Sequence, residues 1–111
     1  MLLTELLTAP ATEGTLTELL HEVIDPELGI NIVDLGLIRD ISIAPDGGVL
    51  VVMTLTTPAC PLGPYITDEI RQLLGQVTTI SNVEVEVVWS PAWDPERDMS
   101  DHAKKLLGWT L

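Results

Sequence analysis

A small α+β domain is the fold class that this sequence predicts, with its elements in the order α-β-β-α-β-α. Segments in which apolar and polar residues alternate are typical of half-buried strands, and segments with an apolar residue every three or four positions are typical of amphipathic helices. A chain of 111 residues is also long enough for one core. Residues 1–14 have no sustained period and are expected to form a flexible tail, so the domain is assigned to residues 15–111.

The first expected helix covers residues 16–24. Thr15 and Glu18 have the spacing of a capping box, and the apolar residues that follow share one helical face. Asp25 should end this helix, because the residue before a proline avoids helical geometry.

A β-hairpin is expected next. Residues 26–36 show neither a helical nor a strand period and are interpreted as an ordered loop. Residues 37–43 alternate between apolar and polar positions, residues 46–48 have turn composition, and residues 49–56 form a valine-rich run. The two strands on either side of the turn should therefore pair.

The rest of the chain predicts a helix, a strand and a second helix. Apolar residues share one face over 62–74, and valines alternate with glutamates from Val83 to Trp89. Ser100 is a suitable cap for a short helix that continues to Leu107 and ends at a glycine.

The charge balance excludes several classes of partner. Five basic against 17 acidic residues give a formal charge of −12, which repels phosphate backbones and anionic lipids. No apolar run approaches the roughly 20 residues that span a bilayer, and the chain starts without the basic segment of a signal peptide. We therefore expect no nucleic-acid partner, no membrane partner and a cytoplasmic location.

Cys60 is the sharpest candidate for a functional residue. It is the only cysteine, it is flanked by Pro58 and Pro61, and it directly precedes the predicted helix over 62–74. A helix N-terminus favours the thiolate, which is the form that binds metals and attacks electrophiles. The alternative is a buried cysteine that acts as a small apolar residue. One thiolate cannot complete an ordinary iron–sulfur or zinc site, so other ligands must join it.

Three carboxylates, Asp25, Glu27 and Asp34, form a second candidate group within the loop. Carboxylate oxygens can ligate iron or orient a thiolate through hydrogen bonds. The alternative is structural: Asp25 as a turn residue, Asp34 as a cap or turn residue before Gly36, and Glu27 in solvent.

The histidines and tryptophans have simpler interpretations. His21 and His102 are expected to be exposed and to have no functional role. Trp89, Trp93 and Trp109 are expected to pack against the end of the sheet and the last helix.

Several motifs closely resemble the SufT/PaaD-like iron–sulfur cluster assembly domain family, over about residues 15–109. They are DPELGINIVDLGLI at 25–38, TLTTPACP at 54–61, WSPAW at 89–93, and MS at 99–100 followed by AK at 103–104 and LG at 107–108. The resemblance implies a small mixed three-stranded sheet packed by helices and a role in the maturation of iron–sulfur proteins. PaaD-type members have further cysteines in a C-terminal extension, so the chain is expected to be of the SufT type, a stand-alone domain.

By this resemblance the family's cysteine falls on Cys60, and its acidic positions fall on Asp25, Glu27 and Asp34. The leading hypothesis is a non-enzymatic accessory factor that binds iron or an iron–sulfur cluster transiently, with no permanent cofactor. Its partners would be the assembly machinery and apo client proteins, and the second subunit of a homodimer, a partner protein or a small thiol would complete the coordination. One alternative is a metal-free adaptor that docks assembly factors to clients. The other, an enzyme with Cys60 as nucleophile, lacks a suitable base.

Overall fold

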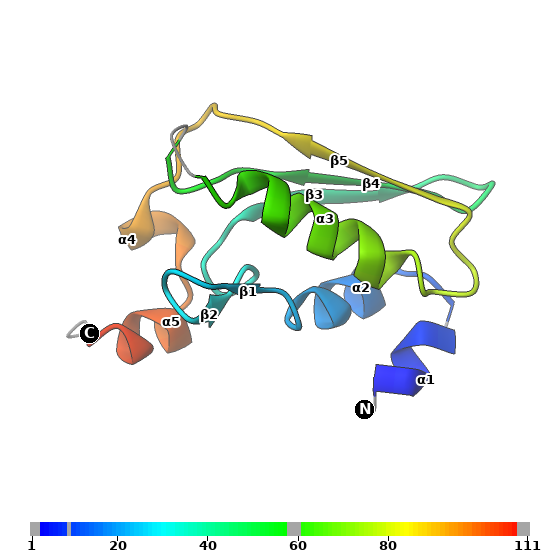
Figure 1. Cartoon of the computed structure of the whole chain (residues 1–111), viewed down its shortest axis with the longest axis horizontal. Helices are drawn as coiled ribbons and strands as arrows, with labels where there is room; N and C mark the ends of the chain where they lie inside the picture. Colours follow the sequence, from blue (N-terminus) through cyan, green and yellow to red (C-terminus); the bar gives the residue numbers. More distant parts are fainter. Residues whose placement is uncertain (1–2, 9, 58–60, 109–111) are drawn as a thin grey trace.

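The computed structural model describes residues 3–8, 10–57 and 61–108, and it confirms an α+β fold (Figure 1). The three-stranded sheet packs against helices on one side, and a two-stranded sheet lies near the C-terminal helices. The elements are α1 (Leu3–Thr8), α2 (Glu13–Leu20), β1 (Ile24–Asp25), β2 (Ile30–Asn31), β3 (Ile38–Ile43), β4 (Gly48–Met53), α3 (Gly63–Leu74), β5 (Asn82–Val87), α4 (Pro95–Asp98) and α5 (Asp101–Leu106).

The main sheet has the strand order β3-β4-β5 and is mixed, as expected. β3 and β4 form the predicted antiparallel hairpin, in which Ile41 lies opposite Val51. β5 runs parallel to β4, with Val85 opposite Val51. A parallel neighbour requires a crossover connection, and α3 provides it between β4 and β5.

The core lies between one face of this sheet and the helices. Val49, Val51 and Met53 of β4 are at most 3% exposed, because β4 is the central strand and the helices cover it. Apolar residues of α2 and α3 complete the layer at the helical spacing that the sequence predicted. These residues are Leu16, Leu19, Leu20, Ile66, Ile70 and Leu74.

The N-terminal part differs from the sequence-based prediction. α2 begins one turn earlier, with Thr12 as its N-cap. The side chain of Thr12 accepts a hydrogen bond from the Thr15 amide, and the side chain of Thr15 accepts one from the Thr12 amide. Thr15 is thus the third helical residue rather than the cap, and this alternative capping box competes with the one proposed for Glu18.

α1 lies within residues 1–14, for which the sequence showed no period. This helix of six residues packs on α2, and Leu6 is 8% exposed within the core. A helix this short is marginal in isolation, so tertiary contacts determine it rather than a pattern in the sequence.

The end of α2 also differs from the prediction. α2 ends at Leu20, and Ile24 and Asp25 form β1 rather than the last helical turn. β1 pairs with β2 in a small antiparallel sheet inside the expected loop.

No helix among the described residues is long and apolar enough to cross a membrane.

Candidate functional site

The residues that follow β4 and the first residue of α3 lie close together in space. Leu55 is buried two residues after β4, and a Cβ atom at Gly63 would lie 2.9 Å from Cδ1 of Leu55. The segment between Leu55 and Gly63 therefore begins and ends at neighbouring positions in the core. Cys60, in this segment, lies outside the described residues, so the prediction for its thiol stays a prediction.

The N-terminus of α3 can attract negative charge. Leu62 is the N-cap and makes no side-chain capping hydrogen bond, and the first turn contains no acidic residue. Pro64 lacks an N–H group, but Gly63 and Tyr65 have amides among the first three helical positions, which lack intrahelical acceptors. Those amides and the helix dipole favour an anionic group near this end.

Asp25 has a structural function in the β1–β2 connection. Its side chain is 4% exposed, and Oδ1 accepts hydrogen bonds from the amides of Glu27 at 2.8 Å and Leu28 at 3.3 Å. This is an Asx-turn, the structural alternative considered for a residue before proline. Glu27 itself is exposed.

Asp34 links the loop to the last helix. Its Oδ2 accepts a hydrogen bond from Nδ2 of Asn31 at 2.7 Å, and its Oδ1 accepts one from Oγ of Ser100 at 2.9 Å. Burial opposes ionisation of this carboxyl. The bonds from Asn31 and Ser100, helped by His21 and His102, nevertheless hold the pKa of Asp34 below its ordinary value.

The structure does not assemble the three carboxylates into a metal site by themselves. Among the described residues, no group of three or more His, Cys, Asp or Glu side chains is arranged to hold a metal ion, and this includes Asp25, Glu27 and Asp34. Any site that uses them would therefore depend on Cys60 or on ligands from another molecule.

His21 and Trp89 lie in environments that differ from the predicted ones. His21 is half-buried rather than exposed, with Nδ1 2.9 Å from the carbonyl oxygen of Thr17, whereas His102 is exposed as expected. Trp89 is 44% exposed rather than packed. Trp93 does pack, and its indole Nε1 donates a hydrogen bond to the carbonyl oxygen of Leu35 at 2.7 Å. Trp109 lies outside the described residues.

Hydrogen bonds connect all the sequence motifs in one region. Trp93 links the segment 89–93 to the loop through Leu35, and the Ser100 amide donates to the carbonyl oxygen of Asp34 at 2.8 Å. The Thr54 amide, in the segment that leads to Cys60, donates to the carbonyl oxygen of Leu37 at 2.8 Å. Segments that are far apart in the sequence thus form one continuous framework.

Sequence reasoning missed two residues of this framework, Arg39 and Asp98. Nη2 of Arg39 lies 3.7 Å from Oδ2 of Asp98, which also accepts hydrogen bonds from Arg97 at 2.8 Å and from the Asp94 amide at 2.9 Å. These bonds lower the pKa of the Asp98 carboxyl, chiefly through Arg97. Arg39 and Asp98 are 59 positions apart, so no local pattern relates them.

Together these features define a class of protein: a small α+β domain in which the chain between β4 and α3 contains a cysteine. A family model described as iron–sulfur cluster assembly protein matches residues 13–87. The chain belongs to this family.

Relatives of known role are similar over most of their length. The chain is 46% identical to the Fe-S protein maturation auxiliary factor SufT of Staphylococcus aureus, over 78% of this chain and 97% of that protein. It is 44% identical to the auxiliary factor YitW of Bacillus subtilis, over 80% and 86% of the two chains. A solved domain of unknown function from Bacillus anthracis is 40% identical, with a TM-score of 0.82, over 86% of this chain and 91% of that one.

Proposed function

We propose that this chain is a non-enzymatic auxiliary factor for the maturation of iron–sulfur proteins, in which Cys60 supplies a thiolate that binds iron or a cluster transiently. The observation that carries the proposal is the 46% identity to SufT over nearly the whole of that factor. The iron or cluster is cargo in this account. The proposed place of action is the cytoplasm, together with the assembly machinery and apo client proteins.

The geometry around α3 supports the role proposed for Cys60. In the sequence Cys60 comes three residues before α3, whose N-cap residue Leu62 makes no side-chain capping hydrogen bond and whose first turn contains no acidic residue. Such an end favours a thiolate and any anionic cluster that the thiolate holds. Because no described group of side chains completes a metal site, the remaining ligands would come from a second copy or from a partner.

Anaerobic reconstitution with iron and sulfide tests this proposal. We expect visible absorption from the wild-type protein and none from Cys60→Ser, with little change in melting temperature, because a residue in a connection should contribute little packing. Cys60→Ser should also abolish activation of an apo client enzyme. A melting temperature that collapses in Cys60→Ser would instead identify Cys60 as a core residue.

A pair of glutamate variants tests the proposed carboxylate ligation. Glu27→Gln should weaken iron binding, because it removes a carboxylate and leaves the backbone turn held by Asp25. Glu22→Gln is the matched control, since Glu22 is also exposed and lies in the same part of the chain. Equal iron binding by the two variants would contradict a role for Glu27.

The second candidate function is a metal-free adaptor, in which the helix-and-loop face around Cys60 docks an assembly factor or a client protein. An adaptor would give no absorption after reconstitution, and Cys60→Ser would still activate the client. The same two measurements therefore separate the candidates.

A further inference from the structure

The three-stranded sheet ends at β5, and the inner face of β5 is only partly covered. Val83, Val85 and Val87 point to the same side as the core residues of β4 and pack against the core, but they are only partly buried. Their β4 counterparts, Val49, Val51 and Met53, are at most 3% exposed. The difference arises because β4 has a strand on each side, whereas β5 has a paired strand on one side only among the described residues.

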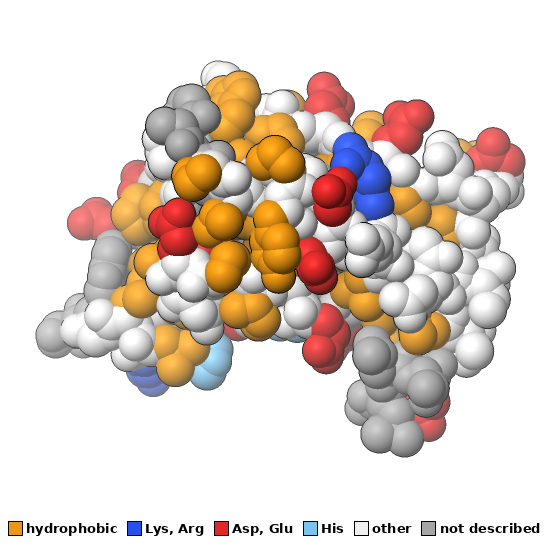
Figure 2. All heavy atoms as spheres, viewed as in Figure 1, with side chains coloured by type: hydrophobic (Ala, Val, Ile, Leu, Met, Phe, Trp, Pro, Cys, Tyr) orange, Lys and Arg blue, Asp and Glu red, His pale blue; other side chains and the backbone are white. Residues whose placement is uncertain are grey.

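A groove lies where a fourth strand would pack. It has a volume of about 460 Å³ and runs between β5 and α3, with Val85, Val87 and Trp89 on one wall and Pro64, Thr67 and Arg71 on the other. Figure 2 shows hydrophobic side chains gathered on this face of the molecule, next to an acidic and a basic side chain. An added strand would place every second side chain in this groove.

The backbone of β5 provides the second element of such a site. A strand at the edge of a sheet has N–H and C=O groups that do not pair within the sheet, and an extended peptide can bind to them. Figure 1 shows β5 as the outermost strand, with α3 beneath it. Backbone pairing and an apolar groove are therefore available along the same edge.

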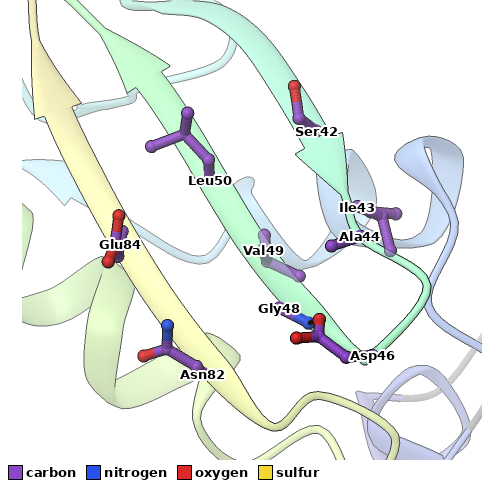
Figure 3. Close-up of a pocket in the computed structure, with 9 residues that line it drawn as sticks. All are labelled: Ser42, Ile43, Ala44, Asp46, Gly48, Val49, Leu50, Asn82 and Glu84. Carbon is purple, nitrogen blue, oxygen red and sulfur yellow. Dashed lines mark hydrogen bonds between the residues drawn. The ribbon is translucent and has the colours of Figure 1, made fainter.

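The other face of β5 is acidic and determines the kind of partner. Glu84 and Glu86 are exposed and lie opposite Leu50 and Val52 of β4. In Figure 3 Glu84 lies on the same open part of the sheet as Leu50. The outward side chains of an added strand would lie beside these glutamates, within a protein of formal charge −12.

We propose that the free edge of β5 binds an extended segment of a partner protein in which apolar residues alternate with Lys or Arg. The apolar side chains enter the groove beside α3, and the basic side chains pair with Glu84 and Glu86. Opposite charges at neighbouring cross-strand positions stabilise pairing, and like charges destabilise it.

A second copy of the chain fits this edge poorly. Antiparallel pairing of two β5 strands centred on Val85 would place Glu84 directly opposite Glu86 of the other copy. A shift that aligns the two Glu84 residues leaves like charges facing each other as well. The edge thus favours a basic partner over self-association, and this inference does not depend on the role of Cys60.

The test uses an acetylated seven-residue peptide of alternating Lys and Val, titrated into the isotope-labelled full chain and followed by NMR. We expect shift changes at β5 amides and at the Trp89 indole, and slower hydrogen exchange at β5 amides. A peptide of the same sequence with alternate backbone amides methylated should not bind, because it cannot make the strand hydrogen bonds. An alternating Glu and Val peptide should not bind either.

Two charge-reversal variants separate the edge from general electrostatics. Glu86→Lys should weaken binding of the Lys–Val peptide about fivefold, given the size of cross-strand charge effects. Asp40→Lys, on the opposite edge strand β3, changes the net charge equally and should weaken it less than twofold. Equal weakening by both variants, binding of the methylated peptide, or no shifts at millimolar peptide would overturn the proposal. A wild-type dimer that forms through β5 without peptide, seen as slower hydrogen exchange at the β5 amides as the protein concentration rises, would also overturn it.

Discussion

Single residues in the loop between β1 and β3 determine how closely distant segments approach. Gly36 has a φ of +78°, and a Cβ atom at this position would overlap the backbone carbonyl of Asp98. A glycine is required here for two reasons, the left-handed backbone and the contact with α4. Gly29 has a φ of +69°, but a Cβ atom there would have no neighbouring atom within 4 Å.

These two glycines give a matched prediction for stability. Gly29→Ala should lower the free energy of unfolding by about 1–2 kcal/mol, which is the strain of a left-handed alanine. Gly36→Ala should lower the free energy of unfolding by about 1–3 kcal/mol more than Gly29→Ala does, because the overlap with Asp98 displaces α4 from the loop. Urea denaturation measures both values.

Equal losses for Gly29→Ala and Gly36→Ala would contradict the close approach of Asp98. If Gly36→Ala does not fold while Gly29→Ala does, that outcome is the larger loss of stability that the overlap with Asp98 predicts. A folded Gly36→Ala protein with normal stability would show that the loop and α4 are separate.

At the scale of elements, α5 is fixed to the loop by one serine. Oγ of Ser100 accepts a hydrogen bond from the Ala103 amide at 3.1 Å, which caps α5, and donates one to Asp34 at 2.9 Å. The same side chain therefore begins a helix and holds a carboxylate. The sequence predicts Asp34 as a candidate iron ligand, and this arrangement adds a structural role to that prediction.

The lowered pKa of Asp34 predicts a pH dependence of stability. Because the unfolded state binds a proton more readily, the contribution of Asp34 is complete above its unfolded pKa of about 3.9. It is lost as the pH falls through the lower folded pKa. Asp34→Asn should therefore reduce the difference in unfolding free energy between pH 7 and pH 3, measured by urea denaturation.

Two further variants complete this test. Ser100→Ala should lower the free energy of unfolding at pH 7 by about 1–2 kcal/mol, through the lost cap and the lost bond to Asp34. Glu22→Gln removes an exposed carboxylate and should keep the wild-type pH dependence. An unchanged pH dependence in Asp34→Asn would show that the hydrogen bonds of Asp34 do not stabilise its charge.

At the scale of the whole molecule, a one-cysteine site requires a second source of ligands. We predict a homodimer or larger assembly at tens of micromolar protein, strengthened by iron, because a second Cys60 would add a second thiolate to the coordination. Light scattering with and without iron measures the mass. Cys60→Ser should remove the iron-dependent part, and Glu22→Gln, which changes an exposed carboxylate and leaves Cys60 in place, should keep it. Monomer under both conditions would contradict this prediction.

Local patterns in the sequence determined much of the fold. The apolar face of α3, the hairpin of β3 and β4, the alternation in β5 and the cap at Ser100 all depend on residues close together in the chain. Hydrophobic period, turn composition and capping act over a few residues, so they can be read without a structure. The motifs also predicted the family.

Tertiary structure decided what local patterns do not encode. α1 and the β1–β2 sheet are too short to show a period and form because other segments pack on them or close the turn between them. The bond from Trp93 to Leu35 and the ion pair of Arg39 with Asp98 join residues 58 and 59 positions apart. The sequence by itself determined which residues are candidates for the functional site and which helices and strands lie next to them in the chain. Only the folded chain decided that Asp25 and Asp34 hold backbone and helix in place, and that β5 is the last strand of the sheet among the described residues, because both depend on contacts between distant segments.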